Sequence, residues 1–357
     1  MVFGFRKTKP QGETFKTRVT DFWQWYPHNA DRLFDMIEAG SDEIAGLTSS
    51  FMEKTMPGLA WVFGPGEAGG HSFTVSGEGV VPKQLLAEYW HSRARQIPRW
   101  TFHASRQATP PHQLDDFSIG MRGGKPIDVV NFMIQPTVDA ESESLNIVAW
   151  HPAFEKIPEQ EQYHILFLLL DEALGEFGTE MWLGEIKVAP FTNDDTTIKL
   201  SKLPEKIAQV NAYYEWEKVL PIHGFSLYEI KKPIKGPRGD TLFGSTSIPN
   251  VVLDFIENKG KLSENPLKGT GAEFAYITLD GSVIPPGEEV VARSKIADAI
   301  SEALEQAESG LAVGGAFGTQ NSYIDLIAFD GQNSEAIVMK LLDQLQLTGR
   351  TAFNRYG

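Results

Sequence analysis

The segment 313–325, VGGAFGTQNSYID, holds the residues whose types and spacing could contact a ligand most directly. Gly314 and Gly315 permit positive φ angles and let another backbone or a ligand approach closely. A phosphate-binding loop needs such glycines between a strand and a helix N-terminus, whereas here a second strand follows. The pattern therefore predicts a bulged hairpin between two strands, with a ligand-contacting loop as the alternative.

Four further side chains complete the set of candidate ligand- or partner-binding residues. Tyr323 and Asp325 alternate onto one face of their strand, and Asp325 is either a functional carboxylate or an outward-facing polar residue. His103 lies within a predicted strand among aromatic residues, which favours a hydrogen-bonded structural histidine. Trp25 lies roughly opposite the apolar stripe of its helix, so it is either exposed or packed on a second surface.

No residue pattern in the chain indicates a metal centre or a nucleophile. The sequence has no cysteine, which excludes disulfides, thiolate zinc sites, iron–sulfur clusters and cysteine nucleophiles. None of the 8 histidines falls into an HxH, HExxH or HxxxH pattern. A GxSxG serine motif is also absent. We therefore expect no cofactor and no metal.

The residue pattern in the last third of the chain predicts one βαββαβ unit, which would contain the glycine-rich segment 313–325. Apolar runs indicate strands at 274–279, 311–318, 323–329 and 351–356. Amphipathic patterns indicate helices at 288–308 and 334–345. This order is the ferredoxin-like pattern, so we expect an antiparallel sheet with both helices on one face. Many unrelated functions use that fold.

The first half of the chain predicts two helices followed by a second α+β unit. Apolar steps of three and four residues indicate helices at 14–39, kinked or split at Pro27, and at 42–54. The order ββαβββαβ follows, with strands at 59–64, 71–76, 99–105, 127–134, 145–150 and 181–188. Its helices are expected at 82–96 and 159–176.

These patterns predict an α+β protein of two domains, each an antiparallel sheet with helices packed on one face. A length of 357 residues suits two domains. The Lys-, Pro- and Gly-rich stretch 231–240 is the clearest boundary. We expect a flexible N-terminus (1–12), an N-terminal domain (13–190), a linker with a helix (191–239) and a ferredoxin-like C-terminal domain (240–357).

Composition and charge narrow the class of partner. The net charge of −15 disfavours nucleic acid, because phosphate neutralisation needs a basic face. No apolar run approaches the ~20 residues that span a bilayer, and the first residues lack the apolar run of a signal peptide. The sequence therefore predicts a soluble cytoplasmic protein that binds another protein or a small molecule, with no nucleic-acid or membrane partner.

The N-terminal half resembles a family of uncharacterised bacterial proteins that contains a domain of unknown function. The segments that carry the resemblance are FWQWYPHNADRLF (22–34), PRWTFHASR (98–106), IDVVNFMI (127–134) and MWLGEIKV (181–188). The resemblance covers roughly residues 13–190 and extends weakly to the segment around 314–330. It implies a bacterial cytoplasmic protein and carries no catalytic residue over to this chain.

The sequence favours a non-enzymatic binding or regulatory protein, because no coherent nucleophile, base or metal set is present. Binding would use the sheet faces or the cleft between domains. One alternative is a hydrolase-like, small-molecule-binding enzyme whose site assembles from distant residues, since catalytic triads are spatial. A second alternative is an acidic inhibitor of a nuclease or toxin.

Overall fold

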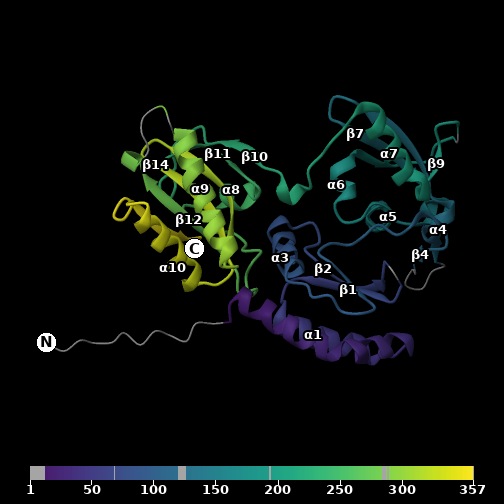
Figure 1. Ribbon diagram of the computed structural model, residues 1–357. Helices are drawn as coiled ribbons and strands as arrows, with labels where there is room; N and C mark the ends of the chain where they lie inside the picture. The colour runs from purple at the N-terminus through teal and green to yellow at the C-terminus, as the bar shows by residue number, and fades with distance from the viewer. Residues whose placement is uncertain are drawn as a thin grey trace.

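The computed structural model describes residues 13–356 except 68, 120–125, 193, 284–286 and 288. The predicted flexible N-terminus, residues 1–12, lies outside this range. Three units of secondary structure follow one another along the chain, as the colours of Figure 1 show. We name them the N-terminal unit (13–105), the middle unit (106–217) and the C-terminal unit (218–356). No helix in the described residues is long and apolar enough to cross a membrane.

The N-terminal unit packs two helices against a small sheet. Helix α1 begins after Thr14, whose hydroxyl accepts a hydrogen bond from the Thr17 backbone N–H. It continues through Pro27 as one helix, so of the two predicted outcomes the split is wrong and the kink stays a prediction. The sheet order is β1-β2-β3, and α3 connects the parallel strands β2 and β3. The elements are α1 (Phe15–Glu38), α2 (Glu43–Thr55), β1 (Ala60–Pro65), β2 (His71–Ser76), α3 (Val81–Ser92) and β3 (Trp100–His103).

The middle unit folds around its own sheet. The strand order is β8-β7-β6-β9, with β7 and β8 parallel, and β4 and β5 form a separate pair. The predicted strand 127–134 is broken by a 3-10 turn at Val129–Asn131. Its strands are β4 (Ser118–Ile119), β5 (Ile127–Asp128), β6 (Met133–Asp139), β7 (Ser144–Trp150), β8 (Leu183–Val188) and β9 (Ile198–Lys199). Its helices are α4 (Pro111–Leu114), α5 (Glu159–Leu174), α6 (Gly178–Trp182) and α7 (Leu203–Tyr214).

The C-terminal unit is built on a 6-stranded sheet of order β10-β11-β13-β14-β12-β15. Every neighbouring pair is antiparallel. Strands β13 and β14 form the predicted hairpin, and the expected bulge occurs between Ala312 and Gly314. The strands are β10 (Ser226–Glu229), β11 (Thr241–Thr246), β12 (Glu273–Asp280), β13 (Gly310–Gly318), β14 (Asn321–Ala328) and β15 (Thr351–Arg355). The helices are α8 (Pro249–Glu257), α9 (Glu289–Gln306) and α10 (Gln332–Gln344).

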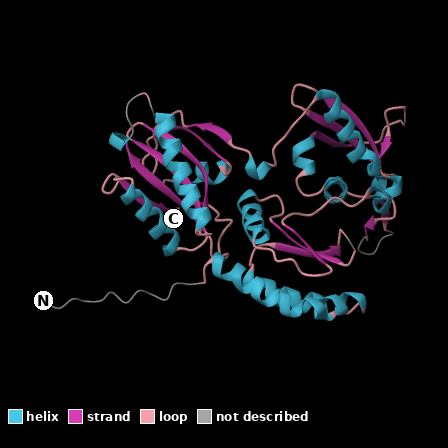
Figure 2. Cartoon of the chain, viewed as in Figure 1, coloured by secondary structure: helices cyan, strands magenta, loops and turns pink. Residues whose placement is uncertain are grey.

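Helices α9 and α10 share one face of this sheet, as expected for the βαββαβ unit, but α8 covers the other face, so the expectation that all helices of the C-terminal domain lie on one face is wrong. Alternate residues of β12 enter two different clusters, because side chains of a strand point to opposite faces. Ala275 and Ile277 pack with Ile300 of α9 and Val338 of α10. Tyr276, on the other face, packs with Phe255 of α8 at 5.8 Å between ring centroids. Figure 2 shows α9 and α10 side by side over the strands.

The α+β class is confirmed, whereas the expectation of purely antiparallel sheets is wrong for the first half, where β2/β3 and β7/β8 are parallel. The hydrophobic clusters do not correspond one to one with the three units. The middle unit has a hydrophobic cluster of its own. The N-terminal unit instead shares one cluster with the α8 face of the C-terminal sheet. The division into domains at 190 and 240 stays a prediction.

Candidate functional site

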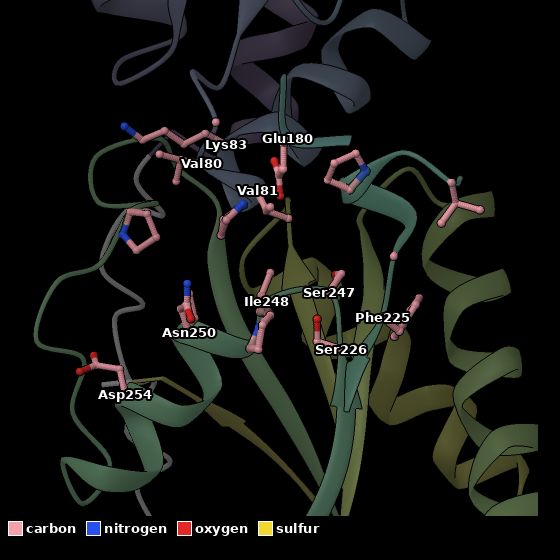
Figure 3. Close-up of a pocket in the computed structure, with 18 of the residues that line it drawn as sticks. Val80, Val81, Lys83, Glu180, Phe225, Ser226, Ser247, Ile248, Asn250 and Asp254 are labelled. Carbon is pink, nitrogen blue, oxygen red and sulfur yellow. The ribbon is translucent and has the colours of Figure 1, made fainter. Parts of the chain in front are cut away.

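A cleft opens where the three units meet. Its volume is about 880 Å³, and residues from α3, α6, α8 and the segment 218–226 line it. Glu180 of α6 enters from one side, while Ile248 and Asn250 at the start of α8 enter from the other (Figure 3). The site therefore depends on the relative placement of elements that are distant in the sequence.

The floor of the cleft is a rigid turn between β11 and α8. The Thr246 hydroxyl donates to the Val313 carbonyl at 2.7 Å and accepts the Ile248 N–H at 3.2 Å. The Ser247 N–H donates to the same carbonyl at 2.9 Å. Gly314 lies directly behind, at φ +151°, where an added Cβ would come within 2.5 Å of Thr246 Cβ. A glycine is required here because any side chain would displace the turn.

The opposite wall comes from the start of α3 and from α6. Val80 precedes α3 without a side-chain cap, and Pro82 lies in its first turn. The Lys218 ammonium donates to the Met181 carbonyl at 2.9 Å, which fastens the segment 218–226 to α6. Apolar and polar residues thus line one opening together, as they do in many small-molecule sites.

A second groove, of about 450 Å³, adjoins the cleft. Both are lined by Phe225 and Ser247, so the two spaces meet at these residues. Arg93 and Glu308 form an ion pair at 2.6 Å in this groove. Burial raises the pKa of the adjacent Tyr89 to about 12, against the lowering effect of Arg93, so its hydroxyl remains protonated and donates to the Glu308 carbonyl.

A buried ion pair lies on the α8 face of the C-terminal sheet. The guanidinium of Arg238 pairs with the carboxylate of Asp325, and both side chains have no exposed surface. Arg238 also donates to the Tyr356 hydroxyl at 2.5 Å, and that hydroxyl donates to Asp325 at 2.7 Å. The Arg238 guanidinium carbon lies 4.8 Å from the ring centroid of Tyr323. The charges are thus neutralised and hydrogen-bonded, as burial requires.

The pKa values of Arg238, Tyr228 and Tyr356 in this network are all raised. Burial opposes the charged form of Arg238, but the Asp325 carboxylate raises its pKa above the ordinary value. Burial raises the pKa of Tyr356 and of Tyr228. Arg238 and the two tyrosines therefore stay protonated near neutral pH, and their hydrogen bonds hold the strands together.

Asp240 extends this network to the β13–β14 hairpin. Its carboxylate accepts the Gln320 N–H at 3.0 Å and the Asn321 N–H at 3.1 Å, and the Tyr323 hydroxyl donates to it. Arg238 and Asp240 both come from the stretch 231–240, which precedes β11. This loop therefore fixes the strand that leads directly into the cleft floor.

The structure brings together four of the six predicted binding residues. Gly314 supports the cleft floor, and Tyr323 and Asp325 belong to the buried network. An added Cβ at Gly315 would strike the Tyr323 carbonyl and the Arg293 guanidinium. The outward-facing interpretation of Asp325 is wrong, because its exposure is 0%. Whether any of the six binds a ligand stays a prediction.

His103 and Trp25 lie apart from these four residues. His103 ends β3 in the N-terminal unit, where burial lowers its pKa despite the opposing influence of Glu67. Trp25 is partly buried on α1 and stacks on Phe51 of α2 at 3.8 Å between ring centroids. Of the two alternatives for Trp25, this contact agrees with packing on a second surface.

Sequence reasoning missed Arg238 and the cleft residues. The loop 231–240 has the composition of a linker, and the partner of Arg238 lies 87 residues further along the chain. One usable signal was Asp325 itself, which lies between the apolar residues Ile324 and Leu326. Glycines at 64, 66 and 69 also fit the GxGxxG spacing, but they lie at the end of β1 and in the turn to the antiparallel β2, so no helix N-terminus follows.

The comparisons with known proteins add no function. No family model, curated protein or solved structure matches the chain. Among the described residues, no group of three or more histidine, aspartate or glutamate side chains is placed to hold a metal ion.

Proposed function

We propose that this protein is a non-enzymatic binding protein that holds a small molecule in the cleft between α3, α6 and α8. The observation that carries the proposal is the 880 Å³ opening at the junction of the three units. Openings of about 300–1,000 Å³ with a few convergent polar groups are typical of ligand sites. A ligand there would contact all three units at once and stabilise their relative placement.

The lining suggests a compact ligand with both apolar surface and hydrogen-bonding groups. Val81, Ile248 and Phe225 offer apolar contact, while Glu180 and Asn250 offer an acceptor and an amide. The hydroxyl groups at the floor already bond the Val313 carbonyl. A serine engaged in this way supports a binding role over a nucleophilic one, because a nucleophile needs a neighbouring base.

A tryptophan placed in the cleft tests the proposal. Asn250→Trp should fill the opening, and Glu257→Trp, at an exposed position of the same helix outside the cleft, is the matched control. We would screen small molecules against the wild-type protein by ligand-observed NMR. A ligand of the cleft should bind wild type and E257W but not N250W. A library without a binder, or binders indifferent to N250W, would contradict the proposal.

Two further points, the fold of the C-terminal unit and the cellular location, are also proposals. We propose that residues 272–357 are a ferredoxin-like unit extended by β10 and β11, supported by the order β13-β14-β12-β15 with α9 and α10 as connecting helices. We also propose the bacterial cytoplasm as its location, on the resemblance of the N-terminal half. An experimental structure and cell fractionation test these two points.

A further inference from the structure

One part of the C-terminal sheet lacks a cover on the α9 face. Strand β10 is an edge strand of the sheet (Figure 1). Its residue Leu227 is 86% exposed. Phe243 of the next strand is 50% exposed, and Val290 at the start of α9 is 61% exposed. An edge strand with large apolar side chains in water favours pairing with another chain.

These side chains share one face because of the strand register. Leu227 and Glu229 alternate onto the same face of β10, and Glu229 is opposite Phe243. Phe243 is in turn opposite Phe317, with ring centroids 5.2 Å apart. Arg293 of α9 lies over Phe317 at 4.6 Å from the ring centroid. We call the surface of Leu227, Glu229, Phe243, Phe317 and Arg293 the β10 face.

The two charged residues of the β10 face form no ion pair within the described part of the chain, and the opposite charges that act on Arg293, those of Asp325 and Asp298, do so from beyond ion-pair distance. Neither Glu229 nor Arg293 forms an ion pair with a described residue, and the Arg293 Nε is buried without a hydrogen bond. The two residues lie at opposite ends of the face, with the apolar side chains between them. Only β11 lies between β10 and β13 in the sheet, so two strand spacings separate Glu229 from Phe317, which is roughly 10 Å.

We propose that the β10 face binds the same face of a second copy of this chain. A two-fold axis makes residue i contact residue j while j contacts i. Because Glu229 and Arg293 lie at opposite ends of the face, such an axis would place each Glu229 against the partner's Arg293. The apolar side chains of the two faces would then pack against each other. This complementarity selects a second copy over an unrelated partner, and the interface is separate from the cleft.

Molar mass by sedimentation equilibrium over a wide concentration range tests the proposal. The wild-type chain of 39.6 kDa should reach twice that mass. Glu229→Lys and Arg293→Glu should each weaken the dimer about tenfold or more, because each creates two like-charge contacts. The double variant E229K/R293E should recover much of the affinity, since it exchanges the charges across the axis.

Two further variants keep the test independent of folding. Leu227→Lys changes a side chain that is 86% exposed, so it should dissociate the dimer without changing the melting curve of the monomer. Glu185→Lys alters net charge equally on exposed β8 and should leave the dimer intact. A monomer at every concentration, or a dimer unaffected by L227K, would overturn the proposal. Failure of the double variant to recover affinity would overturn the ion pairing.

Discussion

The middle unit and the C-terminal unit stabilise their sheets in different ways. In the middle unit, the described residues that are buried include no Asp, Glu, Lys or Arg. The C-terminal sheet buries Arg238 and Asp325 completely. Apolar packing fixes a core by shape, whereas a buried ion pair also fixes which loop must occupy one position. The buried ion pair therefore fixes the position of the loop 231–240 in the C-terminal unit, which also forms the cleft floor.

Breaking the buried pair should give the largest effect. Asp325→Asn leaves the charge of Arg238 buried without a counter-ion, so unfolding free energy should fall by about 3–5 kcal/mol. Thermal and urea unfolding would measure the loss. The double variant Arg238→Met with Asp325→Leu removes both charges and should recover most of it. Equal losses in the single and double variants would contradict the role of the ion pair.

A cavity in the middle unit should cost nearly as much and stay local. Leu166→Ala on α5 removes a fully buried side chain, so we expect a loss of about 2–5 kcal/mol. Hydrogen exchange should show faster exchange in β6 and β7 and unchanged exchange in β12 and β14, because the clusters share no residue. Leu168→Ala, at a position 38% exposed on the same helix, is the control. Faster exchange throughout the chain would contradict separate cores.

Gly315→Ala should have an intermediate effect. The added methyl group would strike the Tyr323 carbonyl and the Arg293 guanidinium, so we expect a loss of about 1–3 kcal/mol. Gly46→Ala in α2 meets no atom within 4 Å and should instead stabilise by about 0.5–1 kcal/mol. Melting curves compare the two. Unchanged stability in G315A together with weaker binding of a cleft ligand would favour the ligand-contacting loop.

The smallest effect concerns pH and the N-terminal unit. Burial lowers the pKa of His103 from 6.5, so the folded state binds fewer protons than the unfolded state. Its contribution to stability is therefore complete above pH 6.5 and is lost as pH falls through the lowered pKa. His103→Gln should flatten the fall of melting temperature on acidification. His112→Gln, at an exposed position, is the control, and identical pH profiles for H103Q and wild type would refute the prediction.

Local pattern was enough to predict most elements of the C-terminal unit. Strand β12 and helix α10 lie within two residues of the predicted 274–279 and 334–345, because their apolar periodicity is uninterrupted. The pattern could not show that α8 covers the second face, since both faces of β12 are apolar. Pro27 does not split α1, because buried residues before and after it, Tyr26 and Ala30, hold the helix in place by tertiary packing.

The candidate site was less predictable because it depends on long-range placement. The cleft combines Val81, Glu180 and Asn250, which belong to three separate units. The burial of Arg238 likewise depends on a carboxylate in β14 that no local pattern connects to it. Sequence reasoning found Asp325 and Gly314 because each is unusual within its own strand, and it had no such signal for residues in a loop.

The core shared by the N-terminal and C-terminal units sets an order of events during synthesis. Residues 13–105 leave the ribosome first, yet Phe15 and Tyr89 contact Phe329 through their rings. The backbone of Phe15 also donates to the Gly271 carbonyl at 3.1 Å. The middle unit can fold around its own core as soon as it is synthesised. The N-terminal unit can complete its core only after the C-terminal strands have been synthesised. The newly made N-terminal unit therefore exposes apolar surface until the C-terminal sheet arrives, which makes this interval the one in which a chaperone would act.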